Sequence, residues 1–294
     1  MKKFLIILLL LPLALYSSEN ADSVKVWTFG GLTTFNFSQV SLSNWAAGGR
    51  SSSSGVALFN VFGNYKKDLI SWENNLDLGY GLLKEQDNSM VKSNDKFDFN
   101  SKFGVKESDK FFYSALFSFK TQFAPGYKYP NTTDAISRFM APGYLSLSFG
   151  IDYKPAKILS VFVSPLSGKM TIVTDNVLSG MGAFGVDPGK NVRYEVGSFV
   201  KVELKADIMK NVNLGTKVDF FSNYLKKPGN VDVNWDLLLN MKINDYLSAN
   251  FIANMIYDDD IKTTVDRNND GIMESAGPKV QFKEMFGVGL SLKF

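Results

Sequence analysis

Cysteine and histidine are both absent from this 294-residue sequence. Without cysteine there can be no disulfide, no thiolate metal site and no c-type haem attachment. Without histidine there is no Ser-His-Asp triad and no imidazole general base. The G-x-S-x-G nucleophile motif is missing as well. We therefore predict that the protein is not an enzyme and carries no cofactor.

Long apolar runs are also scarce, and the clearest one lies at the N-terminus. Lys2 and Lys3 precede an apolar stretch from Phe4 to about Leu15, which is followed by Tyr16, Ser17 and Ser18. This stretch is shorter than the roughly 20 residues that a spanning helix needs, and its order of parts is typical of a secretory signal peptide. We predict a signal peptide over residues 1–18 and one domain over residues 19–294. Cleavage would lower the formal charge from +3 to about +1, which gives no case for a nucleic-acid partner.

The last nine residues alternate strictly. Apolar side chains occupy every second position, namely Phe286, Val288, Leu290, Leu292 and Phe294. A strand with this pattern has one apolar face, and ending on an aromatic it resembles the closing strand of bacterial outer-membrane β-barrels. Such a strand is the signal for the barrel-assembly machinery. Since no later helix-length apolar run is present, membrane insertion requires a closed barrel.

Segments of similar alternation recur along the whole chain. They predict an all-β fold, a transmembrane antiparallel β-barrel of about 12 strands. The expected strands are residues 25–38, 54–65, 70–83, 96–106, 111–123, 144–154, 158–165, 192–208, 212–224, 231–243, 246–257 and 279–294. Tight turns alternate with mostly long loops, which is typical of outer-membrane barrels with both termini in the periplasm. A soluble β-sandwich also alternates, but it gives no reason for alternating loop lengths.

If the aromatic faces contact lipid, the opposite faces line the lumen. Ten acidic and ten basic residues have this inward parity, and acids on one strand tend to face bases on the next. The expected lumen charge network comprises Glu73, Asp77, Lys102, Lys106, Glu203, Lys205, Lys217, Asp232 and Asp236. A selective pore would show an excess of one sign. The balance therefore leaves two hypotheses open, ion pairs that brace a closed lumen or a narrow channel with weak ion preference.

Two loops carry further signals. Residues 166–191 are unusually apolar, so they either fold inward as a plug or extend a hairpin through Met170–Val173. In residues 266–274, Asp266, Asn268 and Asp270 have the one-three-five spacing of a calcium loop, with Glu274 nearby. Gly277 occupies the twelfth position, where the bidentate glutamate belongs, so the hypothesis of a calcium site in this loop rests on a partial motif.

Several stretches resemble one known family. They are SNWAAGGRSSSS at 43–54, APGYLSLSFGIDYKP at 141–155, SPLSGKMTIVTDN at 164–176, GAFGVDPG at 182–189 and VNWDLLLNMKIND at 233–245. The family is domain of unknown function 3078, an uncharacterised outer-membrane family of Gram-negative bacteria. The resemblance implies a single β-barrel, and it brings no catalytic residues to transfer.

Together these features predict a barrel in the bacterial outer membrane. The first functional hypothesis is a narrow channel or transport protein for small solutes or lipids. The alternative is a structural or partner-binding barrel with a salt-bridged, closed lumen and functional external loops. The expected partners are outer-membrane lipid and, through the Phe294 strand, the barrel-assembly machinery.

Overall fold

The computed structural model of the chain describes residues 26–42, 50–86, 88–265 and 274–294. The predicted signal peptide and the calcium-loop residues Asp266, Asn268 and Asp270 lie outside these ranges. Glu274 begins a short strand, and its side chain is not described. Within the described ranges, no helix has the length and hydrophobicity needed to cross a membrane.

Strands dominate the described chain, and short helices occur in one loop. The elements are β1 (Trp27–Val40), β2 (Ser52–Lys67), β3 (Ile70–Glu85), β4 (Val91–Lys106), β5 (Phe111–Thr121), β6 (Gly126–Tyr127), β7 (Ala135–Ser137), β8 (Gly143–Ala156), β9 (Leu159–Ile172), α1 (Asn176–Gly180), η1 (Ala183–Gly185), β10 (Val192–Met209), β11 (Val212–Asn223), β12 (Val231–Lys242), β13 (Leu247–Tyr257), β14 (Lys262–Val265), β15 (Glu274–Pro278) and β16 (Gln281–Lys293).

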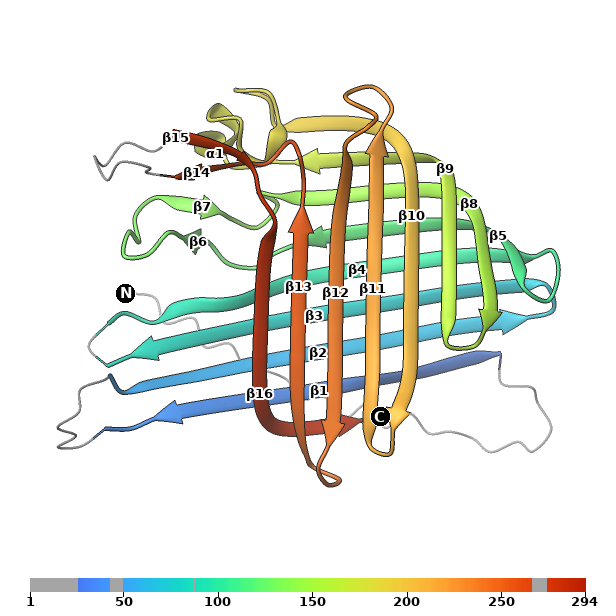
Figure 1. Cartoon of the computed structure of the whole chain (residues 1–294), viewed down its shortest axis with the longest axis horizontal. Coiled ribbons are helices and arrows are strands. Elements are labelled where there is room, and N and C mark those ends of the chain that lie inside the picture. The colour runs from blue at the N-terminus through green and yellow to red at the C-terminus, as the bar shows by residue number, and fades with distance from the viewer. Residues whose placement is uncertain (1–25, 43–49, 87, 266–273) are drawn as a thin grey trace.

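Twelve of these strands form one closed antiparallel barrel. Its order is β1-β16-β13-β12-β11-β10-β9-β8-β5-β4-β3-β2, and β2 returns to β1 (Figure 1). The last residue completes the seam, because the amide of Gly31 donates to the carbonyl of Phe294 at 2.9 Å and Phe294 donates back at 3.1 Å. Closure leaves no unpaired sheet edge, which is the condition for strands in a bilayer. The predicted fold class and strand number are confirmed.

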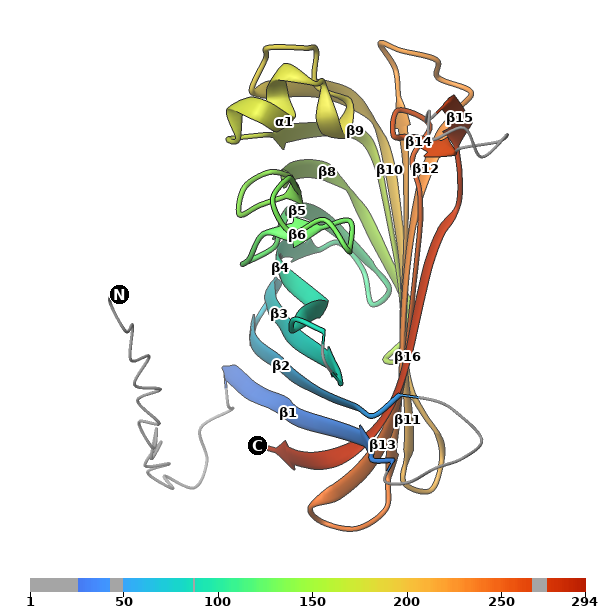
Figure 2. The ribbon, with the colours of Figure 1, turned by 90° about the vertical axis from the view of Figure 1, so that its left-hand side faces the viewer.

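The barrel has two opposing walls. In Figures 1 and 2, β1–β4 form one wall and β11–β13 with β16 form the other, and the strands of the two walls cross. Strands that tilt in a barrel cross in this way when the two sides are seen in projection. Short turns lie at one end of the barrel, called the turn end below. The opposite, loop end carries the hairpins β6–β7 and β14–β15 together with α1.

Strand boundaries differ most from the prediction at β9. We expected this strand to end at Pro165, but it continues to Ile172. Proline lacks the amide hydrogen that a ladder needs, so a strand passes through it only at a bulge. The register against both β8 and β10 shifts at this point. The bulge therefore lets the strand include Met170, as the hairpin-extension hypothesis for residues 166–191 required.

The remainder of that loop folds back on the rim of the barrel. Asp175 caps α1 by accepting hydrogen bonds from the amides of Val177 and Leu178, both at 3.0 Å. Ala141, Val173, Leu178 and Val186 form a small buried apolar cluster. The apolar residues of this loop thus form a small local core at the loop end of the barrel.

Candidate functional site

The outer wall of the barrel is apolar and exposed. Phe35, Phe149, Phe286 and Leu290 keep 50–65% of their side-chain surface accessible. Soluble monomers rarely expose contiguous apolar surface of this extent, whereas membrane barrels carry such a band around their waist. The chain is therefore a transmembrane β-barrel of the outer-membrane type.

Aromatic side chains gather on this wall at the turn end. Trp27 stacks on Phe29 with ring centroids 5.4 Å apart, and it also meets Tyr65 at 5.3 Å and Trp72 at 5.9 Å. The indole nitrogen of Trp72 donates to the hydroxyl of Ser101 at 2.8 Å. Rings with one polar atom suit the boundary between lipid and water, so this group has the composition of an interfacial girdle.

Charged side chains fill the lumen in successive groups, the first near the turn end. Lys102 lies 3.4 Å from Glu73 and 2.7 Å from Asp152. Lys154 pairs with Glu73 as well and lies 3.3 Å from Asp152. Ser160 donates to Asp152 at 2.6 Å. Each of the four charges therefore has two partners of opposite sign.

At mid-height, ion pairs cross the lumen. The amine of Lys217 on β11 lies 3.3 Å from Asp77 on β3 and 2.8 Å from Asp98 on β4. Lys96 on β4 lies 3.4 Å from Asp236 on β12. In the closed order of twelve strands, β11 and β3 are six strands apart, and so are β12 and β4. These pairs therefore join walls that are diametrically opposite.

Asparagine side chains complete the hydrogen bonding of these carboxylates. Asn100 donates to Asp98 at 2.7 Å, while Asn60 and Asn254 donate to Asp77 and Asp236. Buried charges are tolerated only when their remaining lone pairs are satisfied. The crossing is thus built from groups that satisfy one another. We define Asp77, Asp98, Asp236, Lys96 and Lys217 as the lumen crossing.

A third set of charges lies beside the crossing. Asp219 lies 3.1 Å from Lys120 and 3.4 Å from Lys201, and Lys201 lies 3.8 Å from Glu203. Apolar side chains fill the neighbouring volume: Leu116, Phe162, Phe199 and Phe221 form a buried cluster that faces inward from β5, β9, β10 and β11. This part of the lumen resembles the core of a soluble protein more than the wall of a pore.

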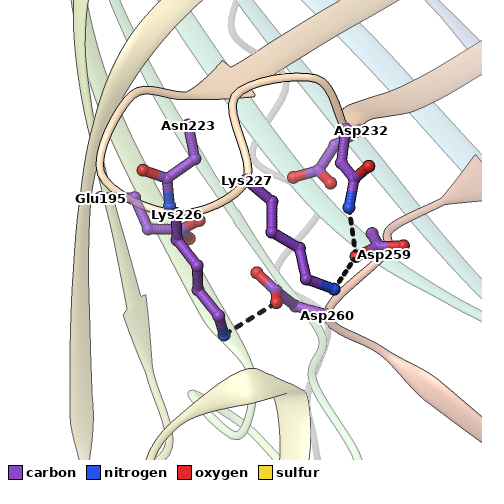
Figure 3. A pocket seen from close by; sticks show the side chains of 8 residues that line it. Glu195, Asn223, Lys226, Lys227, Asp232, Asp259 and Asp260 are labelled. Atoms are coloured by element: carbon purple, nitrogen blue, oxygen red, sulfur yellow. Dashed lines mark hydrogen bonds and ion pairs between the residues drawn. The ribbon is translucent and has the colours of Figure 1, made fainter.

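The rim of the loop end holds the fourth charged group (Figure 3). Lys226 and Lys227 in the β11–β12 loop lie 3.0 Å from Asp260 and Asp259, respectively. Arg193 at the start of β10 also contacts Asp260. Partial burial acts to raise the pKa of Asp260, but the hydrogen bond from Lys226 and the charge of Arg193 outweigh it and hold this pKa below its usual value. The residues of Figure 3 enclose a cavity of about 10 Å³, room for about one water molecule.

The structure brings some of the predicted network residues together and separates others. Glu73 meets Lys102, as the neighbouring strands suggested, whereas Asp77 and Asp236 meet Lys217 in the crossing. Asp232 lies near the rim, 2.9 Å from Lys169.

Three further predicted residues lie at the margins of the network. Glu203 contacts Lys201 beside the crossing. Lys205 is exposed and makes no ion pair among the described residues. Lys106 is directed to its own turn, where it lies 2.7 Å from Asp109 and its hydrogen bond holds the pKa of Asp109 below the usual value. Proximity to the end of β4 explains the difference, because the turn offers Lys106 a nearer carboxylate than the lumen does.

Sequence reasoning missed several members of the network. Lys96 lies at the margin of the strand expected over residues 96–106, whereas β4 begins at Val91 and places Lys96 well inside the strand. Asn60, Asn100 and Asn254 share the inward parity, but as uncharged residues they carry no signal for a charge network. Lys169 fell in the segment that was expected to be a loop.

Comparison with known proteins supports the resemblance noted in the sequence. The model of a family described as protein of unknown function (DUF3078) matches residues 37–127. The predicted resemblance is confirmed for this part of the chain. None of the curated proteins matches the sequence.

Solved structures with a similar trace are distant in sequence. An outer-membrane channel from Pseudomonas putida F1 is 13% identical with a TM-score of 0.41, and the match covers 94% of this chain and 98% of that one. The translocator domain of the autotransporter NalP from Neisseria meningitidis is 10% identical with a TM-score of 0.36, covering 92% and 90%. The P. putida toluene transporter TodX is 10% identical with a TM-score of 0.32, covering 92% and 80%.

Proposed function

We propose that this chain is a bacterial outer-membrane barrel with a closed lumen, which acts through the ordered surface of its external loops. The observation that carries the proposal is the lumen crossing, in which Lys217 and Lys96 reach carboxylates on the opposite wall. An open pore needs a continuous water path, and side chains that meet across the lumen interrupt it at mid-height.

The proposed orientation places both termini and the short turns in the periplasm. It is supported by the alternation of turns and loops and by the C-terminal strand that seals the barrel. The loop end would then face outward. There α1 buries Leu178 against the rim and exposes Val177 and Met181, with 69% and 67% of their surfaces accessible. Exposed apolar residues on an ordered segment are suited to contact with another molecule.

Single-channel recording in a planar bilayer tests the closed lumen. The refolded barrel should give no discrete conductance steps, whereas regular steps from the unmodified protein would refute the proposal. A variant with K96A and K217A removes both long side chains of the crossing and should conduct. Silence of a folded K96A/K217A barrel would mean that other groups close the lumen. K226A/K227A removes two rim amines instead and should stay silent.

Site-directed labelling tests the orientation, and the absence of native cysteine gives it a clean background. Asp134→Cys lies in the long loop between β6 and β7, and Asp109→Cys lies in a turn. A membrane-impermeant maleimide added to intact cells should label the former and not the latter. The reverse pattern would place the loops in the periplasm and overturn the proposed role of the loop surface.

A narrow channel for small polar solutes is the second candidate. It is favoured by one observation: the crossing is made by long lysine side chains of the wall itself. Such side chains can change rotamer without moving the backbone. Conductance that appears only under an applied stimulus in the unmodified barrel would support this candidate.

A further inference from the structure

The outer wall is interrupted at the bulge in β9. The extra residue lies around Pro165, and the hydroxyl of Ser164 donates to the carbonyls of Phe149 and Leu166, both at 2.8 Å. On β8 the facing residue is Gly150, where a Cβ would overlap the carbonyl of Val163. The bulge is therefore fixed by hydrogen bonding and by close backbone approach, and it gives the wall a permanent irregularity.

This irregularity is part of an outward-facing groove of about 730 Å³. Ala115 on β5 supplies a small side chain between larger ones, and the other lining side chains are almost all apolar. The principal lining residues are Phe103, Tyr113, Ala115, Phe149, Ile151 and Val163. In a bilayer, a groove on this face is open to acyl chains.

Two lysines lie on the turns that end the strands of the groove. Lys110 precedes β5, and its carbonyl accepts a hydrogen bond from the amide of Lys154 at 2.7 Å. Lys157 lies in the turn after β8, and both lysines are exposed. Two other lysines at this end pair with a carboxylate of their own turn: Lys106 lies 2.7 Å from Asp109, and Lys242 lies 2.7 Å from Asp245. No ion pair within the described ranges engages the amine of Lys110 or Lys157.

We propose that this part of the wall binds one anionic phospholipid. An acyl chain lies in the groove, and the phosphate is held at the turn end by Lys110 and Lys157. An acyl chain gains little hydrophobic free energy on leaving other acyl chains, so shape and charge decide the affinity. A lysine near an anionic headgroup is worth about a fivefold change in affinity. The assignment of this lipid to the periplasmic leaflet rests on the proposed orientation, in which the short turns face the periplasm. The lipid site itself does not depend on that orientation.

Native mass spectrometry of the full barrel tests the proposal. The barrel is reconstituted with phosphatidylglycerol or phosphatidylcholine and then released into mild detergent. We expect one phosphatidylglycerol to remain bound per barrel, retained better than phosphatidylcholine. K110Q/K157Q should abolish most of this preference, and A115W, which fills the groove, should reduce retention of both lipids.

Matched controls carry the same substitutions away from the groove. K66Q/K67Q neutralises two exposed lysines at the β2–β3 turn, and A57W adds a ring to an exposed outward position on β2. Both should retain lipid as the unmodified barrel does.

Failure to retain one lipid, or equal losses in the groove variants and the controls, would overturn the proposal. So would a barrel that is dimeric and becomes monomeric in A115W, because the groove would then be a contact between copies. Conductance is measured on the same samples, so a failure of the closed-lumen proposal is seen separately.

Discussion

Lys217 offers the sharpest test of the lumen crossing. Its amine lies 3.3 Å from Asp77, 2.8 Å from Asp98 and 3.5 Å from Asp236, and 17% of its side chain is accessible. K217M keeps most of the length of the side chain and removes the charge. Counting the five residues of the lumen crossing, the formal charge changes from −1 to −2.

The structure sets the size of the expected effect. Removing one partner of a buried ion pair costs about 3–5 kcal/mol, because the other charge stays buried without compensation. Lys96 remains 3.7 Å from Asp98 and 3.4 Å from Asp236, so the loss falls mainly on Asp77. We therefore expect a cost near the lower limit, about 3 kcal/mol. Adding D77N restores the formal charge of −1 and should recover about 2 kcal/mol, within the range of coupling between neighbouring residues.

Urea unfolding in lipid vesicles, followed by tryptophan fluorescence, measures these free energies. K226M is the matched control, because Lys226 is 58% accessible and its pair with Asp260 lies at the rim. Exposed pairs contribute about 1 kcal/mol or less. The reasoning is refuted if K217M costs no more than K226M. It is also refuted if the effects of K217M and D77N simply add.

Three further predictions concern the interior, the bulge and the rim. Phe162→Ala should lower the free energy of unfolding by about 3–5 kcal/mol in the same urea assay, because the ring lies in the buried apolar cluster; a loss below 1 kcal/mol would contradict this. Gly150→Ala should cost about 1–3 kcal/mol, because its Cβ would overlap the carbonyl of Val163, whereas Gly168→Ala, with open space around it, should cost less. Partial burial acts to raise the pKa of Asp260, but Lys226 and Arg193 hold it below the usual value for an aspartate. The ionised Asp260 therefore stabilises the fold fully at pH values above the usual pKa, and this stabilisation is lost as the pH falls through the lowered pKa. The protection of the amides of residues 258–261 against hydrogen exchange, measured relative to the intrinsic exchange rate at each pH, should therefore fall at acidic pH in the unmodified barrel, and less so in D260N.

The sequence predicts the faces of the strands well. Alternation of period two places Asp98, Asp219 and Lys201 inside and Phe149 and Leu290 outside, and the structure agrees. The physical reason is that successive side chains on a strand point to opposite sides, so one correct face fixes all the others.

The partners across the lumen are not predictable in the same way. Neighbouring strands follow from the order of the chain, so the pair between Glu73 and Lys102 is predictable from the sequence. The pair between Lys217 and Asp77 is not, because it depends on how far the two walls approach each other. Pro165 shows a second limit. In the sequence it indicates the end of a strand, but in the structure β9 continues past it through a bulge that the hydroxyl of Ser164 and the small Gly150 accommodate.

The lumen is filled by the charged side chains of the lumen crossing and by an apolar cluster, and the free-energy cost of letting water in differs between the two. Opening the lumen crossing exchanges ion pairs for hydrated charges, and for buried pairs the Coulombic gain and the desolvation cost nearly cancel. Opening the cluster of Leu116, Phe162, Phe199 and Phe221 exposes apolar side chains, at about 1.5–3 kcal/mol for each one. Water should therefore enter first between Asp77 and Lys217 and last beside Phe162. A conducting state, if a stimulus produces one, would then carry the charge pattern of the crossing, and substitutions at Lys217 would alter its ion preference more than substitutions at Phe162.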